Sequence, residues 1–293
     1  MKKMLILTRF VKEYEPVRLA EEGRKMGYEV DLVKYGQISL GVSGGKVEID
    51  LRKKRRLDDY EVVVMRASSK KGSSMVGTKT AVLEMLRRDG RARVLNGESF
   101  ERFPLMGKLE QGLVLAKYGV STVDFVSFGS KSGWEDFEEE PWFNFPMVVK
   151  GRFGSHGRAV KLVRDWDGFE EVMKGYKTGE VLVQPKLKIK QWYRCIVVGG
   201  KYLGEMRHRQ KSKYEGEEGK LVKLSEKKMR RLRELCLKAC ELFAIDYAGL
   251  DVAWDEEKQD WVVLEINRTA QFKYFEKRTG VNVAAEMIKV VAM

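Results

Sequence analysis

The stretch WVVLEINRTAQF, residues 261–272, decides how this chain is interpreted. Trp261 to Leu264 is an apolar run rich in β-branched residues that follows a polar segment, so it predicts a buried strand. Alternation along a strand points Glu265 and Asn267 to the same face. A buried glutamate is rare unless it is paired or binds a metal. The strand therefore predicts a partner for two oxygen-bearing side chains.

The segment YAGLDVAWD, residues 247–255, predicts the strand that precedes it. If the two strands pair as a hairpin, Asp251 lies beside Glu265 and Asn267. Two carboxylates and an amide oxygen form a set of hard ligands suited to Mg²⁺. The alternative is that a lysine or arginine pairs with these carboxylates, which is common in so basic a chain.

Composition limits the partners without choosing one. The chain has 293 residues, of which 43% are hydrophobic and 34% charged, enough to build two or three small domains. Lys and Arg number 56 against 43 Asp and Glu, so the net charge is +13. A basic balance favours an anionic partner such as a nucleotide, an acidic peptide or nucleic acid.

Three cysteines and two histidines leave little room for thiol or imidazole chemistry. Cys236 and Cys240 fall on the apolar face of a predicted helix that Ser225 opens, and Cys195 lies in a strand-like run. Unpaired, buried thiols are typical of an intracellular protein. The N-terminal apolar stretch from Met4 to Leu7 is a first strand rather than a targeting segment, and no run is long enough to span a membrane. We therefore expect a cytoplasmic protein.

The first hundred residues alternate between strand and helix patterns. Strands are predicted at MLILTR, EVDLVKY, YEVVVMRAS and ARVLNG, and helices at EPVRLAEEGRKMGY and TAVLEMLRRDG. Such alternation predicts a parallel sheet with helices packed on its faces. No GxGxxG follows the first strand, which argues against a dinucleotide site there. Further along, EDFEEEPWFN predicts a surface turn region, and QWYRCIVVGGKYLGEMRHR predicts a hairpin that turns at Gly199 and Gly200.

Two further stretches have the chemistry of nucleotide binding. In VVKGRFGSHGRAV, a strand ends at Lys150 and a glycine-rich loop follows, which can present backbone N–H groups to phosphate oxygens. The alternative is an ordinary tight hairpin. In VLVQPKL, a strand ends at Pro185, and its last peptide groups can imitate a base pair toward adenine. The alternative there is a strand edge that proline terminates.

The order and spacing of these stretches resemble the ATP-grasp superfamily, and within it the RimK-like amino-acid ligases. The resemblance runs from about Val62 to Val291. It rests on GKLEQGLVLAKYGVSTVDFV, FPMVVKGRFGSHGRAVKLV, YRCIVVGGKYLGEMRHR and the long ending YAGLDVAWD…VVLEINRTAQFKYFEKRTGVNVAAEMI. It implies a mixed α/β and α+β chain, with an N-terminal parallel-sheet pre-ATP-grasp domain before an ATP-grasp fold. The implied domains are 1–97, a central subdomain 98–184 with the phosphate loop, and 185–293 with the metal site.

The resemblance also implies roles for residues of this chain. Lys108 and Lys150 would contact phosphates, and main-chain atoms of Pro185 and Leu187 would hold adenine. Arg194 would neutralise charge on the transferred phosphoryl group. The nucleotide-binding residues so implied are Lys108, Lys150, Gly154, Ser155, His156, Gly157, Gln184, Pro185, Lys186 and Leu187. Asp251, Glu265 and Asn267 would bind one or two Mg²⁺ ions, with Mn²⁺ as a substitute.

The implied activity is ATP-dependent ligation of a carboxylate to an amine through an acyl-phosphate, with release of ADP and phosphate. One substrate is expected to be an amino acid, and the other an acidic peptide, a protein tail or a small molecule. A homo-oligomer is in keeping with the family. Since positioning and charge stabilisation perform this chemistry, no nucleophilic side-chain triad is required.

The acceptor side departs from the family pattern. Pro185 stands where the family has Glu, Trp192 replaces an acidic residue expected near the ribose, and RTAQFKYF follows Asn267. We expect a ligase with an unusual substrate. One alternative is an ATP-grasp kinase. Another alternative is a binding protein that holds nucleic acid, or recruits an acidic protein tail, on the basic stretches 52–56, 186–194 and 207–213. Nucleic acid is not favoured, because a protein that only binds need not keep the metal cluster.

Overall fold

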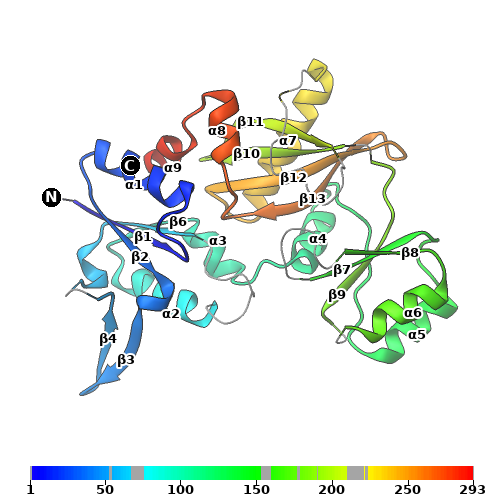
Figure 1. Ribbon diagram of the computed structural model, residues 1–293, viewed down its shortest axis with the longest axis horizontal. Coiled ribbons are helices and arrows are strands. Elements are labelled where there is room, and N and C mark those ends of the chain that lie inside the picture. Colours follow the sequence, from blue (N-terminus) through cyan, green and yellow to red (C-terminus); the bar gives the residue numbers. More distant parts are fainter. Residues whose placement is uncertain are drawn as a thin grey trace. The chain divides into compact units, whose positions relative to one another are not determined.

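The computed structural model describes residues 2–52, 55–66, 76–152, 160–176, 179–189, 191–209, 221 and 224–292. The chain divides into two compact units (Figure 1). Unit 1 comprises Met1–Leu105, Tyr193–Leu250 and Ile266–Met293, and unit 2 comprises Met106–Trp192 and Asp251–Glu265. Among the described residues, every helix is too short or too polar to cross a bilayer.

Unit 1 contains the predicted parallel sheet. Its strands are β1 (Lys3–Thr8), β2 (Glu29–Lys34), β5 (Val62–Met65) and β6 (Arg93–Leu95), in the order β2-β1-β5-β6. Every pairing in this sheet is parallel. The prediction of a parallel sheet is therefore confirmed, and apolar strands buried on both faces explain it, since such a sheet needs helices on each side.

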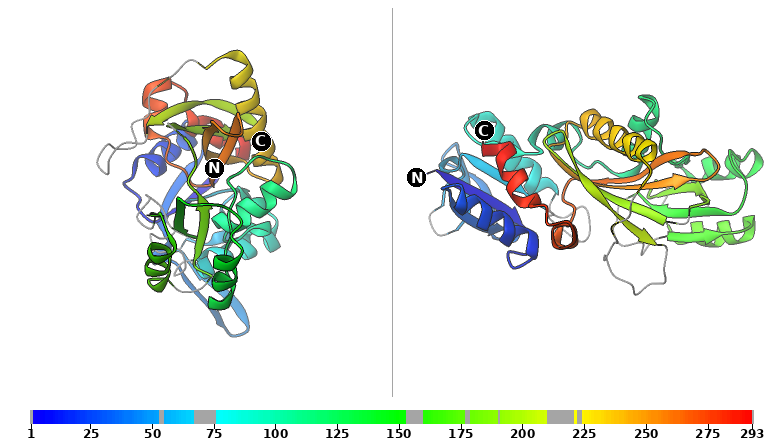
Figure 2. Two further views of the ribbon diagram at one scale, coloured as in Figure 1. Left: turned by 90° about the vertical axis from the view of Figure 1, so that its right-hand side faces the viewer. Right: turned by 90° about the horizontal axis from the view of Figure 1, so that it is seen from above.

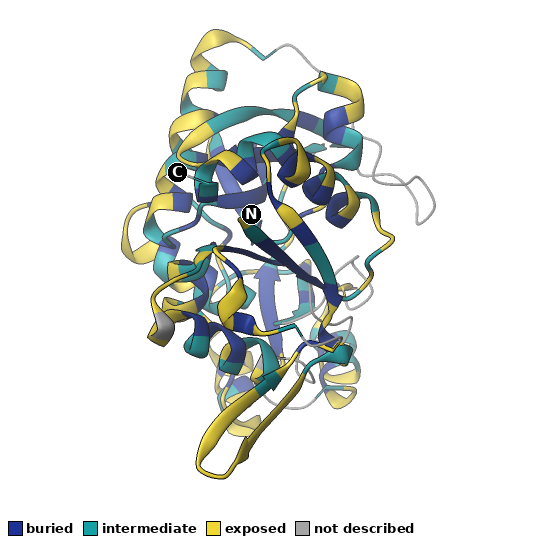
Figure 3. Cartoon of the chain, turned by 90° about the vertical axis from the view of Figure 1, so that its left-hand side faces the viewer, coloured by how far each residue is buried: buried dark blue, intermediate teal, exposed yellow. Residues whose placement is uncertain are grey.

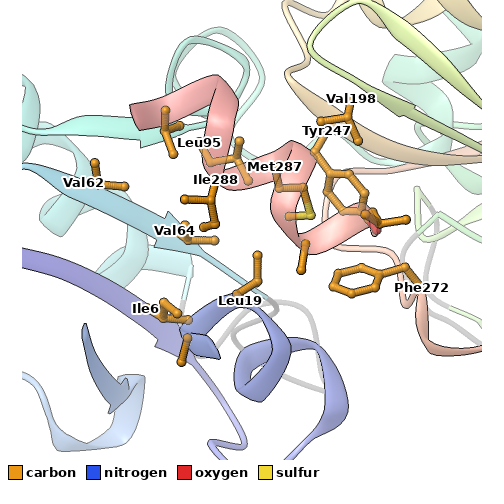
Figure 4. Packing of buried hydrophobic residues seen from close by; sticks show 14 of the residues in the cluster. Ile6, Leu19, Val62, Val64, Leu95, Val198, Tyr247, Phe272, Met287 and Ile288 are labelled. Carbon is orange, nitrogen blue, oxygen red and sulfur yellow. The ribbon is translucent and has the colours of Figure 1, made fainter. Parts of the chain in front are cut away.

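The two faces of this sheet bury alternate residues of the same strands. Met4 and Ile6 of β1 pack against α1 (Tyr14–Lys25) and α9 (Val283–Ala292). Leu5 and Leu7 point the other way and pack with α2 (Val76–Asp89). Figure 4 shows the first of these cores, and α1 and α9 lie side by side in Figures 1 and 2. The period of two along β1 thus places one helical layer on each face.

A two-stranded hairpin of unit 1 stands apart from these layers. It consists of β3 (Ser39–Ser43) and β4 (Lys46–Asp50), and nearly every residue in it is exposed (Figure 3). Gly44 and Gly45 both have positive φ, as a tight two-residue turn requires. Short 3-10 helices flank it at Tyr35–Gln37 and Leu57–Asp59. The helix α3 (Gly97–Arg102) follows β6.

Unit 2 contains a three-stranded antiparallel sheet in the order β8-β7-β9. Its strands are β7 (Met147–Gly151), β8 (Val160–Val163) and β9 (Val181–Pro185). The helices of this unit are α4 (Lys108–Lys117), α5 (Lys131–Glu139) and α6 (Trp166–Lys174). An aromatic core joins α5 and α6 to the sheet, with Trp134 and Phe137 buried from α5.

The helix α5 corrects one prediction. The acidic segment EDFEEEPWFN was expected to form a surface turn, but its first five residues belong to α5. The side chain of Ser130 caps the helix by accepting from the N–H of Gly133. Trp134 and Phe137 lie three apart on one face and are buried, so their packing outweighs the polar residues around them.

The remaining sheet has the order β11-β10-β12-β13. Its strands are β10 (Gln191–Val198), β11 (Lys201–Arg209), β12 (Tyr247–Asp255) and β13 (Asp260–Asn267). The predicted hairpin turn at Gly199 and Gly200 is confirmed, with φ positive at both. Ser225 caps α7 (Glu226–Leu242) as predicted, and Cys195, Cys236 and Cys240 are free and buried. The helix α8 (Lys273–Thr279) follows β13 in the chain.

Candidate active site

Most of the predicted ATP and metal residues that the structure describes belong to unit 2. Lys108 begins α4, Lys150 lies in β7, and Pro185 ends β9. Unit 2 contains Lys108, Lys150, Gln184, Pro185, Lys186, Leu187, Asp251 and Glu265, whereas Arg194 and Asn267 belong to unit 1. The predicted loop residues Gly154, Ser155, His156 and Gly157 lie outside the described residues.

Lys108 and Glu265 form an ion pair. The Nζ atom of Lys108 donates to Oε1 of Glu265 over 2.9 Å, and the two side chains are 15% and 30% exposed. The main-chain N–H of Lys108 donates to the carbonyl of Arg152 over 3.3 Å. This hydrogen bond holds the start of α4 against the residue that follows β7. The structure thus brings a predicted phosphate ligand against a predicted metal ligand. It also shows that Glu265 makes the lysine contact which the sequence left as an alternative to metal binding.

Lys150 lies within electrostatic range of this pair. The pKa of Lys150 is lowered to about 8, chiefly by burial and then by the charge of Lys108, while Glu265 acts in the opposite direction. Two lysines and one carboxylate therefore lie near one another in a partly buried place. The surplus positive charge favours an anion such as a nucleotide phosphate.

The depressed pKa of Lys150 predicts a pH dependence of stability. Its ordinary pKa of 10.5 exceeds the folded value of about 8, so the unfolded chain binds more protons between these limits. The cost of the charged, buried lysine is fully present below pH 8 and disappears as the pH rises toward 10.5. We expect Lys150→Met to raise Tm most below pH 8, with the difference from wild type shrinking toward pH 10.5. Thermal unfolding of both proteins across this range tests it, and a difference independent of pH would contradict it.

A small cavity lies next to Lys108. Its volume is about 10 Å³, which is close to the space for one water molecule. The residues that line it are Lys108, Gln111, Gly112, Leu115, Thr122, Val123, Phe125, Gln184, Val263 and Leu264. Leu264 also packs in an apolar cluster with Leu187 and Trp192. Gln184 and Leu187, both predicted for ATP, are thus close to apolar surface of the kind that receives a flat ring.

The residues predicted to bind a metal lie on two neighbouring strands, Asp251 on β12 and Glu265 and Asn267 on β13. Glu265 and Asn267 are half-buried while Ile266 between them is 2% exposed. Asp251 is half-buried between two fully buried neighbours, and its strand β12 is next to β13 in the sheet. Carboxylate and amide oxygens are the ligands that Mg²⁺ prefers, so the residues present fit that ion.

Arg194 lies in β10 beside the strand that carries Asp251. A Cβ atom added at the buried Gly249 would lie 3.1 Å from Cδ of Arg194, so the bare backbone of Gly249 makes room for the arginine stem. His208 of β11 is a near neighbour: burial, and to a smaller extent the charge of Arg194, together lower the pKa of His208 to about 4. At neutral pH the imidazole is uncharged, and the arginine carries the charge of this pair.

The sequence did not predict the role of Asn96. Its Nδ2 donates to the carbonyls of Tyr247 and Arg268 over 2.8 and 3.2 Å. Its Oδ1 accepts from the N–H groups of Asp246 and Tyr247 over 2.7 and 2.8 Å. Asn96 therefore joins the start of β12 to the chain just after β13. The signal available in the sequence was the Asn-Gly dipeptide at Asn96, whose positive φ of 60° is typical of asparagine.

Two family models match the chain. The RimK PreATP-grasp domain covers residues 2–98, and the RimK-like ATP-grasp domain covers residues 107–291. A ribosomal protein bS6–L-glutamate ligase from Escherichia fergusonii is 27% identical over 299 residues, covering 98% of this chain and 94% of the relative. A probable alpha-L-glutamate ligase from Alkalilimnicola ehrlichii is 25% identical over 295 residues, covering 96% and 92%.

Solved structures agree on the fold. The ATP-grasp ligase PsnB complexed with a minimal precursor has a TM-score of 0.72 and 16% identity, covering 100% of this chain and 98% of the other. PsnB complexed with a phosphomimetic variant of that precursor, Mg and ADP has a TM-score of 0.67 and 15% identity over the same shares. The predicted ATP-grasp fold with a pre-ATP-grasp domain is confirmed. The chain belongs to the RimK-like ATP-grasp family of ligases.

Proposed function

We propose that this protein joins a carboxylate to an amine at the expense of ATP, through an acyl-phosphate, and releases ADP and phosphate. The observation that carries the proposal is the cluster of Lys108, Lys150 and Glu265 in unit 2. It combines two cations suited to phosphate with a carboxylate suited to a phosphate-bound metal. Curated relatives named as glutamate ligases support the same reaction class.

The proposed roles follow the positions of the residues. Lys108 and Lys150 bind phosphate oxygens, and Gln184 to Leu187 hold adenine. The N–H of Lys186 donates to the carbonyl of Pro146 over 3.0 Å, so its side chain or carbonyl would make the contact. We assign Gly154, Ser155, His156 and Gly157 to the phosphate loop, and Asp251, Glu265 and Asn267 to one or two Mg²⁺ ions, for which Mn²⁺ can substitute. When bound, Mg²⁺ neutralises charge on the phosphate oxygens.

The chemistry balances without an acid–base triad. An oxygen of the substrate carboxylate attacks the γ-phosphorus, and the bond from that phosphorus to the bridging oxygen of ADP breaks. The amine nitrogen then attacks the acyl carbon, the carbon–oxygen bond to phosphate breaks, and the surplus proton of the amine passes to solvent. We assign to Arg194 the role of neutralising the negative charge that grows on the transferred group. The protein contributes positioning and charge stabilisation.

We propose that one substrate is an amino acid, with L-glutamate the first to test, and that the other is an acidic peptide, a protein tail or a small molecule. The relatives' names support glutamate. ATP-dependent chemistry on such substrates fits the cytoplasm. The boundaries 1–97, 98–184 and 185–293 remain our proposal for the domains, and a homo-oligomer remains the expectation for the assembly.

The described parts of the basic stretches do not favour a nucleic-acid function. Arg55 pairs with Asp31 over 2.6 Å, Arg56 pairs with Asp58 over 3.0 Å, and Lys188 pairs with Glu257 over 2.7 Å. Charges that neighbouring carboxylates neutralise contribute little to a phosphate-binding surface. Lys53, Lys54, Lys190 and residues 210–213 lie outside the described residues.

An assay of ADP release tests the proposal. The protein is incubated with Mg-ATP, a panel of amino acids and short acidic peptides, and hydroxylamine as a surrogate amine. We expect turnover that requires one carboxylate and produces its hydroxamate. ADP release that is accompanied by a phosphorylated substrate, with no hydroxamate formed, would instead identify a kinase. Salt-sensitive binding of RNA or DNA by a protein that does not hydrolyse ATP would favour the nucleic-acid function.

A further inference from the structure

Two cations of unit 1 lie against one aromatic ring. The Nζ atom of Lys79, in α2, is 3.4 Å from the centroid of the Phe100 ring. The Cζ atom of Arg268, directly after β13, is 4.3 Å from the same centroid. The guanidinium of Arg268 also donates to the carbonyl of Ser99 over 2.6 Å, which fixes its position. Elements far apart in the sequence thus bring two positive charges to Phe100.

Arg66, directly after β5, is a third cation of this group. The residue is 5% exposed, and its Nη2 donates to the carbonyl of Ala270 over 3.1 Å. Its Nη1 atom is buried and has no hydrogen-bond partner within the described part of the chain. A buried, charged donor without an acceptor is costly, so such a group in a native protein calls for an explanation.

The positive charges of Arg268 and Arg66 affect the protonation of Lys79. Burial lowers the pKa of Lys79 well below its usual range, and the charges of Arg268 and Arg66 lower it further. Within the described residues, no salt bridge to Lys79 or Arg66 is found. Like charges in a partly dry place repel one another, and an anion between them would reverse that repulsion.

This group lies close to Arg194, which we assign to the reacting substrate. Burial raises the pKa of Tyr247 to about 12, while the positive charges of Arg66 and Arg194 both act against that rise. One tyrosine hydroxyl is therefore near both arginines. Nη2 of Arg66 and the hydroxyl of Tyr247 both donate to the carbonyl of Ala270, and a Cβ atom at Gly249 would meet both Ala270 and Arg194.

We propose that Arg66 and Lys79, with Arg268 beside them, form a binding site for a carboxylate of the substrate other than the one that reacts. Nη1 of Arg66 and Nζ of Lys79 offer donors to the two oxygens of one carboxylate, whereas phosphate would bring a further oxygen to satisfy. The substrate would thus carry at least two carboxylates. That the bound carboxylate belongs to a substrate rests on the proposed ligase function, whereas the existence of the anion site does not.

Lys79→Met tests the site without ATP chemistry. Tm is measured with glutarate, with inorganic phosphate, and with NaCl at the same ionic strength. We expect glutarate to raise the Tm of wild type but not that of Lys79→Met, which loses a desolvated charge and should be at least as stable alone. The control is Lys238→Met, an exposed helical lysine of unit 1, which should respond as wild type does. The proposal would be overturned if glutarate raised Tm equally in wild type and Lys79→Met, or did not raise the Tm of wild type. If only phosphate raised Tm in a way that depends on Lys79, the assignment to a carboxylate would be overturned.

A kinetic measurement separates this inference from the proposed function. If wild type turns over a dicarboxylate, Lys79→Met should raise its KM by about 10-fold with little change in kcat, as the loss of one charge-assisted contact predicts. An unchanged KM in a working ligase would overturn the inference alone. Absence of turnover in wild type, together with a Lys79-dependent glutarate shift, would instead count against the ligase and support the site.

Discussion

Replacing Glu265 with alanine is expected to reduce ADP release by about 100-fold or more, because a lost metal ligand removes several kcal/mol of charge stabilisation at the phosphates. The same change leaves Lys108 without the carboxylate that it contacts at 2.9 Å. Glu265→Gln keeps the shape of the side chain and should also be severely impaired, since a neutral amide is a weaker ligand for Mg²⁺. ADP release is measured at several Mg²⁺ concentrations.

The Mg²⁺ dependence separates two roles of Glu265. If it binds metal, Glu265→Gln should need more Mg²⁺ for half-maximal activity than wild type. If it only holds Lys108, the Mg²⁺ requirement should not move. The control is Glu257→Gln, which removes an exposed carboxylate of unit 2 paired with Lys188 and should behave as wild type. Full activity in Glu265→Ala would contradict the assignment of this residue.

Adding one methyl group at Gly249 is expected to destabilise unit 1 by about 1–3 kcal/mol, as overpacking of a core does. A Cβ atom there would lie 2.5 Å from Cβ of Ala270 and 3.1 Å from Cδ of Arg194. The Cβ atom of Ala270 has little freedom to move, since Gly249 and Ala270 are both buried, whereas the half-buried arginine stem can be displaced. We expect Gly249→Ala to lower the free energy of unfolding and, by displacing Arg194, to lower kcat as well. Denaturant unfolding and steady-state kinetics measure the two effects.

A second substitution, at Ala270, tests whether the loss of stability comes from the steric contact. Ala270→Gly removes the methyl group that the new one would meet, so Gly249→Ala with Ala270→Gly should recover much of the lost stability. Gly45→Ala is a poor match because of its positive φ, whereas Gly41→Ala adds a methyl group in open space on the exposed hairpin and serves as the control. Equal losses in the single and the double variant would contradict the steric explanation.

Much of the fold could be predicted because its signals are local. The apolar runs of β1 and β5 alternate with amphipathic helices, and that order predicts a parallel sheet. Ser225 before the apolar face of α7, and Gly199-Gly200 between β10 and β11, are short-range signals of a helix start and a hairpin. The helix α5 was missed because two buried aromatic residues, Trp134 and Phe137, outweigh an acidic composition.

The site was harder to predict because its contacts join distant parts of the chain. The residue types at Asp251, Glu265 and Asn267 indicated a metal, and that assignment remains a prediction. The partner of Glu265 could not be read from local sequence, since Lys108 is 157 residues away. The same holds for Arg66 and Arg268, whose proximity to Lys79 depends on how three elements of unit 1 pack. Pairing over such distances is fixed by the fold rather than by any local pattern.

Transfer of an oxygen isotope tests the central claim most directly. The carboxylate substrate that supports ADP release is labelled with ¹⁸O in the reacting group, turned over with Mg-ATP and its amine, and the released phosphate is analysed by mass spectrometry. Attack of that carboxylate on the γ-phosphorus predicts one ¹⁸O in each phosphate formed. Phosphate that contains no ¹⁸O, with an amide formed at the normal rate, would contradict the acyl-phosphate mechanism.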